Sequence, residues 1–249
     1  MTCWRGWMVA ERDPGPLLGK GRAADVYDIG GGRVLRRYRD TGKYGTDPAA
    51  VVDKEAAVML HLRTEGYPVP EVFDADGADL VMQRLDGVTM LADLQSRPWR
   101  VRRHGDTLVD LHNRLVAVPV DGLAAPQGAL SVRFGSPEAI VHLDFHPDNV
   151  MLTADGPVVF DWTNAAVGPA ATDVADAWIV AATGTIDGPW WLRVVGERLR
   201  GRFVDRFVDG CGRAAAIALL PTLGEHRLRD RNMRPEEVAR IRQLLALYS

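Results

Sequence analysis

The chain has 249 residues, 47% hydrophobic and 25% charged, with a formal net charge of -3, so it can bury a substantial core like an ordinary globular protein. The weakly acidic balance argues against a general nucleic-acid binder, and no apolar run reaches the length of a membrane helix. The first 13 residues hold too brief an apolar patch for a signal peptide, and the two cysteines lie too far apart in sequence to suggest a disulfide framework, so we expect a cytoplasmic protein.

The first third of the chain predicts a small antiparallel sheet with one helix. Its strands are short apolar runs separated by glycine turns, and they lie within residues 17–27, 33–38, 72–74 and 80–83. Pro48 opens a helix over residues 49–65, and Tyr67-Pro68 ends it because the residue before proline avoids helical backbone. Residues 1–83 therefore form one predicted lobe, and the polar stretch 84–88 is the predicted hinge.

After the hinge the pattern is mainly helical, so residues 89–249 form the second predicted lobe. A Gly/Pro-rich connection, 119–137, leads to two short apolar runs, 150–152 and 158–160, which flank a turn signal at Asp155-Gly156 and predict a hairpin. The helices of this lobe are expected at residues 90–95, 99–116, 190–208, 212–220 and 235–247, with another whose N-cap is Thr172 or Asp173.

Polar side chains flank this hairpin in an order typical of phosphoryl transfer. His142-Leu143-Asp144-Phe145-His146-Pro147-Asp148-Asn149 precedes the first strand, and Asp161 follows the second. Asp144 and Asn149 stand in the H-x-D-x-x-x-x-N arrangement of a kinase catalytic loop, in which the Asp takes the hydroxyl proton. Amide and carboxylate oxygens are ligands that magnesium prefers. The spacing therefore predicts Asp144 as the catalytic residue and Asn149 and Asp161 as metal ligands.

The same stretch resembles the aminoglycoside phosphotransferase family of small-molecule kinases, which typically has His-Gly-Asp-Leu-His-Pro-Gly-Asn and then Asp-Trp. Leu143 and Asp148 stand here where glycine is usual, and Asp148 adds a negative charge near the proposed metal. The resemblance implies an α+β, two-lobed protein-kinase-like fold, with a small antiparallel-sheet N-lobe and a mainly helical C-lobe. It also implies transfer of the γ-phosphoryl group of ATP, with Mg2+, to a hydroxyl of a small molecule, and a role for Asp173 in bracing the catalytic loop.

The N-lobe supplies the expected nucleotide site. A glycine-rich loop lets backbone amides approach phosphate, an apolar residue covers the base, and backbone groups at the hinge hold it, so GTP is not excluded as an alternative to ATP. The residues expected in these places are Gly19, Gly21, Ala24, Val34, Met82 and Gln83.

The third strand carries arginine where kinases have lysine. Strand alternation places Arg36 on the same face as Val34, so Arg36 is favoured for the phosphates, and Arg37 is the alternative. Glu55, in the middle of the predicted helix, is the expected partner of Arg36. Arginine keeps its charge and can contact phosphate through two N–H groups. Its charge is spread over a planar guanidinium, however, whereas that of lysine is concentrated on one ammonium group.

Two other interpretations compete with a kinase. His142, Asp144 and His146 could form a zinc-hydrolase cluster, but this leaves Asn149 and Asp161 unexplained. The missing lysine suggests instead a nucleotide-binding regulator that has lost catalysis. The intact triplet of Asp144, Asn149 and Asp161 favours the kinase.

The last part of the chain bears on the acceptor. Residues 180–249 hold twelve arginines, no lysine and eight acidic residues, which is a poor electrostatic field for a polycation such as an aminoglycoside. We therefore expect a neutral or anionic hydroxyl compound to be the better acceptor.

Overall fold

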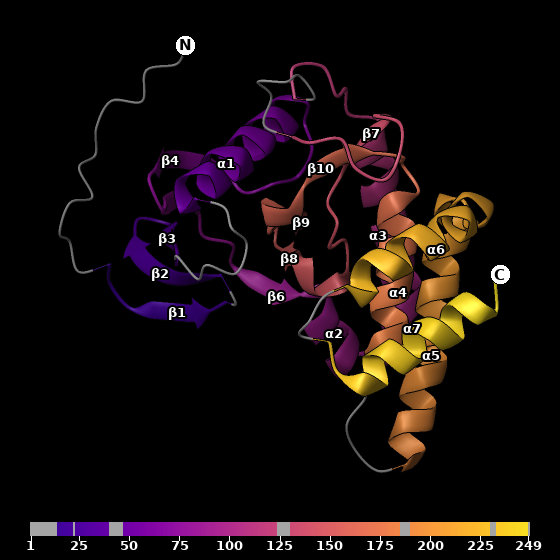
Figure 1. Cartoon of the computed structure of the whole chain (residues 1–249). Helices are drawn as coiled ribbons and strands as arrows, with labels where there is room; N and C mark the ends of the chain where they lie inside the picture. The colour runs from indigo at the N-terminus through magenta and orange to yellow at the C-terminus, as the bar shows by residue number, and fades with distance from the viewer. Residues whose placement is uncertain are drawn as a thin grey trace. The chain divides into compact units, whose positions relative to one another are not determined.

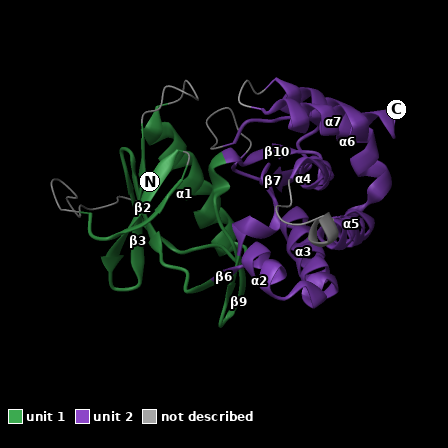
Figure 2. Cartoon of the chain, turned by 90° about the horizontal axis from the view of Figure 1, so that it is seen from below, with its two compact units in different colours: residues 1–87, 151–163 green, residues 88–150, 164–249 purple. Residues whose placement is uncertain are grey.

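The structure, a computed structural model, describes residues 14–21, 23–39, 47–123, 130–184, 190–229 and 233–248, with backbone only at 190–193. The expectation of no signal peptide concerns residues 1–13, which lie outside this set. Within the described part of the chain, no helix combines the length and hydropathy that a membrane crossing requires. Figure 2 colours two compact units: unit 1 is residues 1–87 with 151–163, and unit 2 is residues 88–150 with 164–249.

Unit 1 contains a five-stranded antiparallel sheet in the order β1-β2-β3-β5-β4. The turn between β2 and β3 needs glycine, since Gly31 and Gly32 both have positive φ, at 60° and 71°. All five strands were predicted from the sequence, the first two of them within residues 17–27 (Figure 1). They are β1 (Leu17–Lys20), β2 (Ala24–Gly30), β3 (Arg33–Tyr38), β4 (Val72–Asp76) and β5 (Asp79–Gln83).

The helix of unit 1, α1 (Pro48–Thr64), begins and ends within one residue of the predicted bounds, 49–65. The Asp47 carboxylate accepts the N–H of Ala49 at 3.1 Å, and Pro48 occupies the first position, where no N–H is needed. One face of the helix packs against β4 and β5. Glu55 lies on the buried part of α1 with 0% exposure, among aliphatic residues. A buried carboxylate needs donors around it, so this position marks a polar site inside unit 1.

The predicted hairpin is present as β8 (Val150–Thr153) and β9 (Gly156–Val159), in a three-stranded sheet ordered β6-β8-β9 with β6 (Gly87–Thr89). The end of β9 is tied to unit 1, because the N–H of Val159 donates to the carbonyl of Pro68 at 2.9 Å. The compact units therefore place residues 151–163 with the sheet of unit 1. The lobe boundaries at 84–88 stay a prediction.

Unit 2 is mainly helical, as predicted. Helix α3 packs on α5, and α4 packs on α6 and α7, while a two-stranded sheet pairs β10 with β7 (Figure 1). The elements are α2 (Met90–Ser96), α3 (Val101–Val116), β7 (Ala139–Val141), β10 (Ala166–Gly168), α4 (Thr172–Thr183), α5 (Trp190–Cys211), α6 (Arg213–Leu228) and α7 (Pro235–Ala246).

Two local predictions for this unit are wrong. The N-cap of α4 is Ala171, without a side-chain hydrogen bond, because Thr172 and Asp173 already lie in the helix. Helix α6 does not end at residue 220 but continues through Pro221. An internal proline costs about 3 kcal/mol, and burial of neighbouring apolar side chains such as Leu220 and Leu223 offsets that cost.

Candidate functional site

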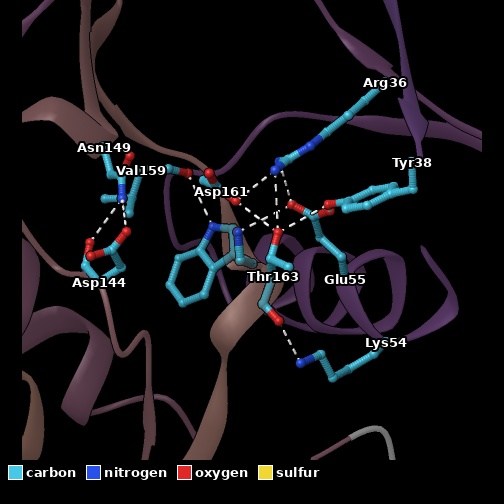
Figure 3. Close-up of polar contacts among 10 residues, drawn as sticks. Arg36, Tyr38, Lys54, Glu55, Asp144, Asn149, Val159, Asp161 and Thr163 are labelled. Carbon is cyan, nitrogen blue, oxygen red and sulfur yellow. Dashed lines mark hydrogen bonds and ion pairs between the residues drawn. The ribbon is translucent and has the colours of Figure 1, made fainter. Parts of the chain in front are cut away.

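A polar network in unit 1 is centred on Arg36, near the end of β3 (Figure 3). Its guanidinium donates to Glu55 at 2.9 Å, to Asp161 Oδ1 at 2.7 Å and to Thr163 Oγ1 at 3.2 Å. The Arg36 side chain is 11% exposed and that of Asp161 is 37% exposed. Asp161 has a φ of 67°, a left-handed conformation that Asp adopts more readily than most residues. The strand, the helix and the end of the hairpin thus meet at one arginine.

Glu55 holds this arginine through a set of donors. Besides Arg36 it accepts the backbone N–H of Trp162 at 3.1 Å and the hydroxyl of Tyr38. Burial raises the pKa of Glu55, and the three donors oppose that shift. Burial alone would lower the pKa of Arg36, but Glu55 and Asp161 outweigh it and raise the pKa, so the guanidinium stays charged. The pairing of Arg36 with Glu55 that the sequence suggested is present.

Arg37, the alternative to Arg36, lies on the opposite face of β3. It makes two hydrogen bonds to Asp79, at 2.7 and 2.8 Å, and Asp79 is its direct cross-strand neighbour on β5. Opposite charges facing each other across a strand pair stabilise the sheet locally. The contacts of Arg37 are therefore with its neighbouring strand, whereas those of Arg36 reach α1 and the segment after β9.

The expected nucleotide residues lie on the sheet of unit 1. Val34 is buried on β3 and pairs with Met82 on β5. Gly21 donates its N–H to the carbonyl of Ala24 at 2.8 Å, and a Cβ at Gly21 would lie 2.9 Å from that oxygen, so this turn requires glycine. A Cβ added at Gly19 would have no other atom within 4 Å, so a side chain would fit at this position. The remaining residue, Gln83, ends β5 with its side chain exposed, and its amide oxygen accepts the N–H of Glu71 at 3.3 Å.

A second polar network lies in unit 2, in the loop after β7 (Figure 3). The Asn149 amide donates to the carbonyl of Asp144 at 2.9 Å and to its carboxylate at 3.2 Å. The His146 imidazole lies 3.2 Å from the other carboxylate oxygen. Burial opposes ionisation of Asp144, but the His146 hydrogen bond and the charges of His146, His142 and Arg227 outweigh it and lower the pKa of Asp144 to about 2. Asp144 is therefore a carboxylate at neutral pH.

Asp173 braces this loop, as predicted. Its two carboxylate oxygens accept the backbone N–H groups of His142, at 2.8 Å, and Leu143, at 2.7 Å. Leu143 has a φ of 59°, a conformation that favours glycine, and glycine is the usual residue of the resembled family at this position. Burial raises the pKa of Asp173 to about 7. Two backbone hydrogen bonds thus hold the chain in a strained conformation directly before Asp144.

The contacts of the motif do not resemble those of a zinc site. His142 is fully buried with its ring edge-on to Phe145, whereas the His146 ring lies 3.2 Å from the Asp144 carboxylate. Within the described residue ranges, no group of three or more His, Cys, Asp or Glu is placed to hold a metal ion. Asp148, the second departure from the family pattern, is exposed and accepts the Thr89 hydroxyl at 3.0 Å.

Four residues of these networks were not singled out in the sequence. Tyr38 could have been found, because it lies two residues after Arg36 on the same strand face. Thr163 contacts Arg36, Tyr38 and Asp161. A threonine at this place in the sequence does not by itself indicate a functional residue. Asp176 and Arg227 form a bidentate ion pair near Asp144. No sequence motif relates these two residues to the loop around Asp144.

Comparisons with known proteins bear on the family and the fold of the chain. A family model for the phosphotransferase enzyme family matches residues 15–131 and 121–216. No curated protein matches the chain. The fold is similar to that of a choline/ethanolamine kinase family protein from Mesorhizobium loti, with 16% identity and a TM-score of 0.51 over 94% of this chain and 87% of that one.

Two aminoglycoside phosphotransferases are also similar in structure at 12% identity. The ADP-bound APH(2'')-Ib has a TM-score of 0.58 over 92% of this chain and 90% of its own. The streptomycin–ATP–APH(2")-IIa ternary complex has a TM-score of 0.59, with 93% and 90% covered. These likenesses confirm the predicted fold, an antiparallel-sheet N-terminal region with a helical C-terminal region. With the family model matching most of its length, the chain belongs to the phosphotransferase enzyme family.

Proposed function

We propose that the protein is a small-molecule kinase that transfers the γ-phosphoryl group of ATP to a hydroxyl group. The observation that carries this proposal is the state of Asp144. Its carboxylate accepts the Asn149 amide, lies 3.2 Å from the His146 ring and has a pKa of about 2. An ionised carboxylate held in this way can accept a hydrogen bond from an acceptor hydroxyl and orient it.

In the proposed reaction the acceptor oxygen forms a bond to the γ-phosphorus while Asp144 takes the hydroxyl proton. The bond from that phosphorus to the β–γ bridging oxygen breaks, and its electron pair leaves with ADP. A carboxylate with a pKa of about 2 is a weak base, so the proton moves late, when the new oxygen–phosphorus bond has largely formed. The main contribution of Asp144 is then to orient the hydroxyl.

The donor site is proposed on unit 1. Two structures with a similar fold hold ADP and ATP, which supports ATP as the donor, with GTP as the alternative. Arg36, charged and held by Glu55, would contact the phosphates, and the loop of Gly19, Gly21 and Ala24 would cover them. Val34 and Met82 would contact the base, with backbone groups near Gln83.

The proposed ligands fit magnesium by their chemistry. Asp161 is a partly exposed carboxylate, and the Asn149 amide donates through its nitrogen, which leaves its oxygen for coordination. When bound, magnesium neutralises charge on the phosphates. Arg36 contacts Asp161 at 2.7 Å and supplies positive charge at the same carboxylate.

That same contact favours a second candidate, a nucleotide-binding regulator without phosphoryl transfer. Arg36 takes the place of the usual lysine and pairs with both Glu55 and Asp161. A broad guanidinium fork held between two carboxylates has less freedom to follow the phosphates than a lysine ammonium. The regulator would bind nucleotide and leave it intact.

One experiment distinguishes the two. The purified protein is mixed with MgATP and a panel of aminoglycosides, sugars, choline-like alcohols and hydroxy acids, and phosphorylated product is measured. Asp144→Asn should reduce kcat by about 10²–10⁴ and leave MgATP affinity unchanged, whereas Asp155→Asn, at an exposed turn, should behave like the parent. Near-parental transfer by Asp144→Asn contradicts the assigned role. Nucleotide binding without transfer to any compound supports the regulator.

A further inference from the structure

A cluster of basic side chains lies beside Asp144 within unit 2; we call Arg133, His226 and Arg227 the basic cluster. Arg227, in the last turn of α6, makes two hydrogen bonds to the buried carboxylate of Asp176, at 2.8 and 2.7 Å. The same guanidinium lies 4.0 Å from Asp144 Oδ1. Arg133 lies 3.2 Å from the His226 ring nitrogen and 5.0 Å from the centre of the Phe134 ring. The cluster therefore reaches the proposed catalytic carboxylate through Arg227.

The charges in this cluster do not cancel. Asp176 neutralises Arg227, but Arg133 has no carboxylate partner within 4.0 Å among the residues that the structure describes. Its contact is an imidazole, and arginine can only donate, so the His226 nitrogen is an acceptor and the ring is neutral. Burial, together with Arg133 and Arg227, lowers the pKa of His226 in the same sense. Arg133 is half-buried, so its charge is only partly solvated.

Other arginines of the C-terminal helices differ from Arg133. Arg213 forms ion pairs with Asp205 and Asp209. Other ion pairs are Arg200 with Glu197, Arg206 with Asp106 and Arg234 with Glu237. These arginines are therefore held in ion pairs on helix faces, whereas Arg133 is not paired with a described carboxylate. A charge close to Asp144 bears on the acceptor more directly than the summed charge of the segment, because interactions between distant exposed charges are screened.

We propose that the basic cluster binds a carboxylate or phosphate group of the acceptor, so that the acceptor is an acidic hydroxyl compound. This rests on the proposed function, in which Asp144 orients the acceptor hydroxyl. Arg133 supplies a planar fork of donors that matches two oxyanion oxygens, and Arg227, the residue after the His226 that Arg133 contacts, is held by Asp176 at 4.0 Å from Asp144. An acceptor of this kind places its anion on Arg133 and its hydroxyl at Asp144. A polycation meets repulsion at the same place.

The test compares matched acceptors that differ only in charge. A hydroxy acid, its primary amide, a phosphorylated alcohol of similar length and kanamycin are used with the parent, Arg133→Gln, Arg133→Lys and the control Arg102→Gln, an exposed arginine on α3. We expect the parent to prefer an acidic acceptor. Arg133→Gln should reduce kcat/KM for that acceptor by at least about tenfold and change kcat/KM for the amide less than threefold, with Arg133→Lys intermediate. The carboxylate and phosphate arms identify which anion is preferred.

Binding of the hydroxy acid and the phosphorylated alcohol without nucleotide, measured by calorimetry, separates this proposal from the proposed function. Binding that is lost in Arg133→Gln but not in Arg102→Gln supports the cluster even if no phosphoryl transfer occurs. Transfer that favours neutral or cationic acceptors, or that falls equally for acid and amide in Arg133→Gln, overturns the cluster and leaves the kinase intact. Unchanged melting of Arg133→Gln ensures that these losses report on binding.

Discussion

Leu143 offers the sharpest test of the loop before Asp144, because it combines a left-handed backbone with a buried side chain. It has a φ of 59° and is 9% exposed, and its N–H donates to Asp173 at 2.7 Å. Truncation to alanine should cost about 2–5 kcal/mol from lost packing, and the backbone strain of about 1–2 kcal/mol remains. Glycine removes that strain, but loses a further methyl group worth about 0.8 kcal/mol and about 0.5–1 kcal/mol of chain entropy. Leu143→Gly should therefore be about as stable as Leu143→Ala.

Val141 provides the matched control, since it belongs to the same buried cluster and lies in β7 without a positive φ. There glycine should be about 1.5 kcal/mol less stable than alanine, because no strain is relieved. Urea unfolding of the four variants, followed by circular dichroism, measures both differences. The glycine and alanine variants are compared at each position by their free energies of unfolding. If this difference is as large at residue 143 as at residue 141, the inference of a strained backbone at Leu143 is refuted.

Three further outcomes test the two networks. Arg36→Ala should weaken ATP affinity in calorimetry by roughly tenfold or more, whereas Arg37→Ala should leave it nearly unchanged; the opposite ranking would assign the phosphates to the other strand face. Asp161→Ala should impair MgATP binding more than Asn149→Ala, because a carboxylate also neutralises charge, and equal parental affinities would remove both from the site. His146 has a raised pKa, so its ion pair stabilises the protein fully below pH 6.5 and progressively less as pH rises through the folded pKa. The melting temperature of His146→Gln should accordingly fall below the parental value by about 2 °C at pH 5 and by less at pH 9, and a deficit that grows with pH would contradict this sign.

Local patterns in the sequence were enough to predict the sheet and helices of unit 1. Alternating apolar residues bounded by Gly30-Gly31-Gly32 and Asp76-Gly77 specify hairpins, since those turns demand backbone that glycine adopts freely. Pro48 marks the start of α1 for an equally local reason, because the first N–H groups of a helix have no partner within it. The loop motif around Asp144 was also readable, because its residues are neighbours in the chain.

Tertiary packing decided what local patterns do not contain. Helix α6 continues through Pro221 because burial of Leu220 and Leu223 outweighs the missing hydrogen bond. Asp173 could have capped its own helix, but its carboxylate instead binds backbone before Asp144, where two buried N–H groups would otherwise lack acceptors.

The networks themselves join residues that are distant along the chain. Strand alternation could favour Arg36 over Arg37 as the residue for the phosphates, but only the fold brought Asp161 to the Arg36 guanidinium. Nothing near Arg227 in the sequence indicates that it pairs with Asp176 beside Asp144. The sequence by itself determined the sheet and the helix of unit 1, and it predicted which loop carries the chemistry. Only the tertiary structure decided which charges face one another, because a buried charge is stable where the folded chain supplies a partner from another element.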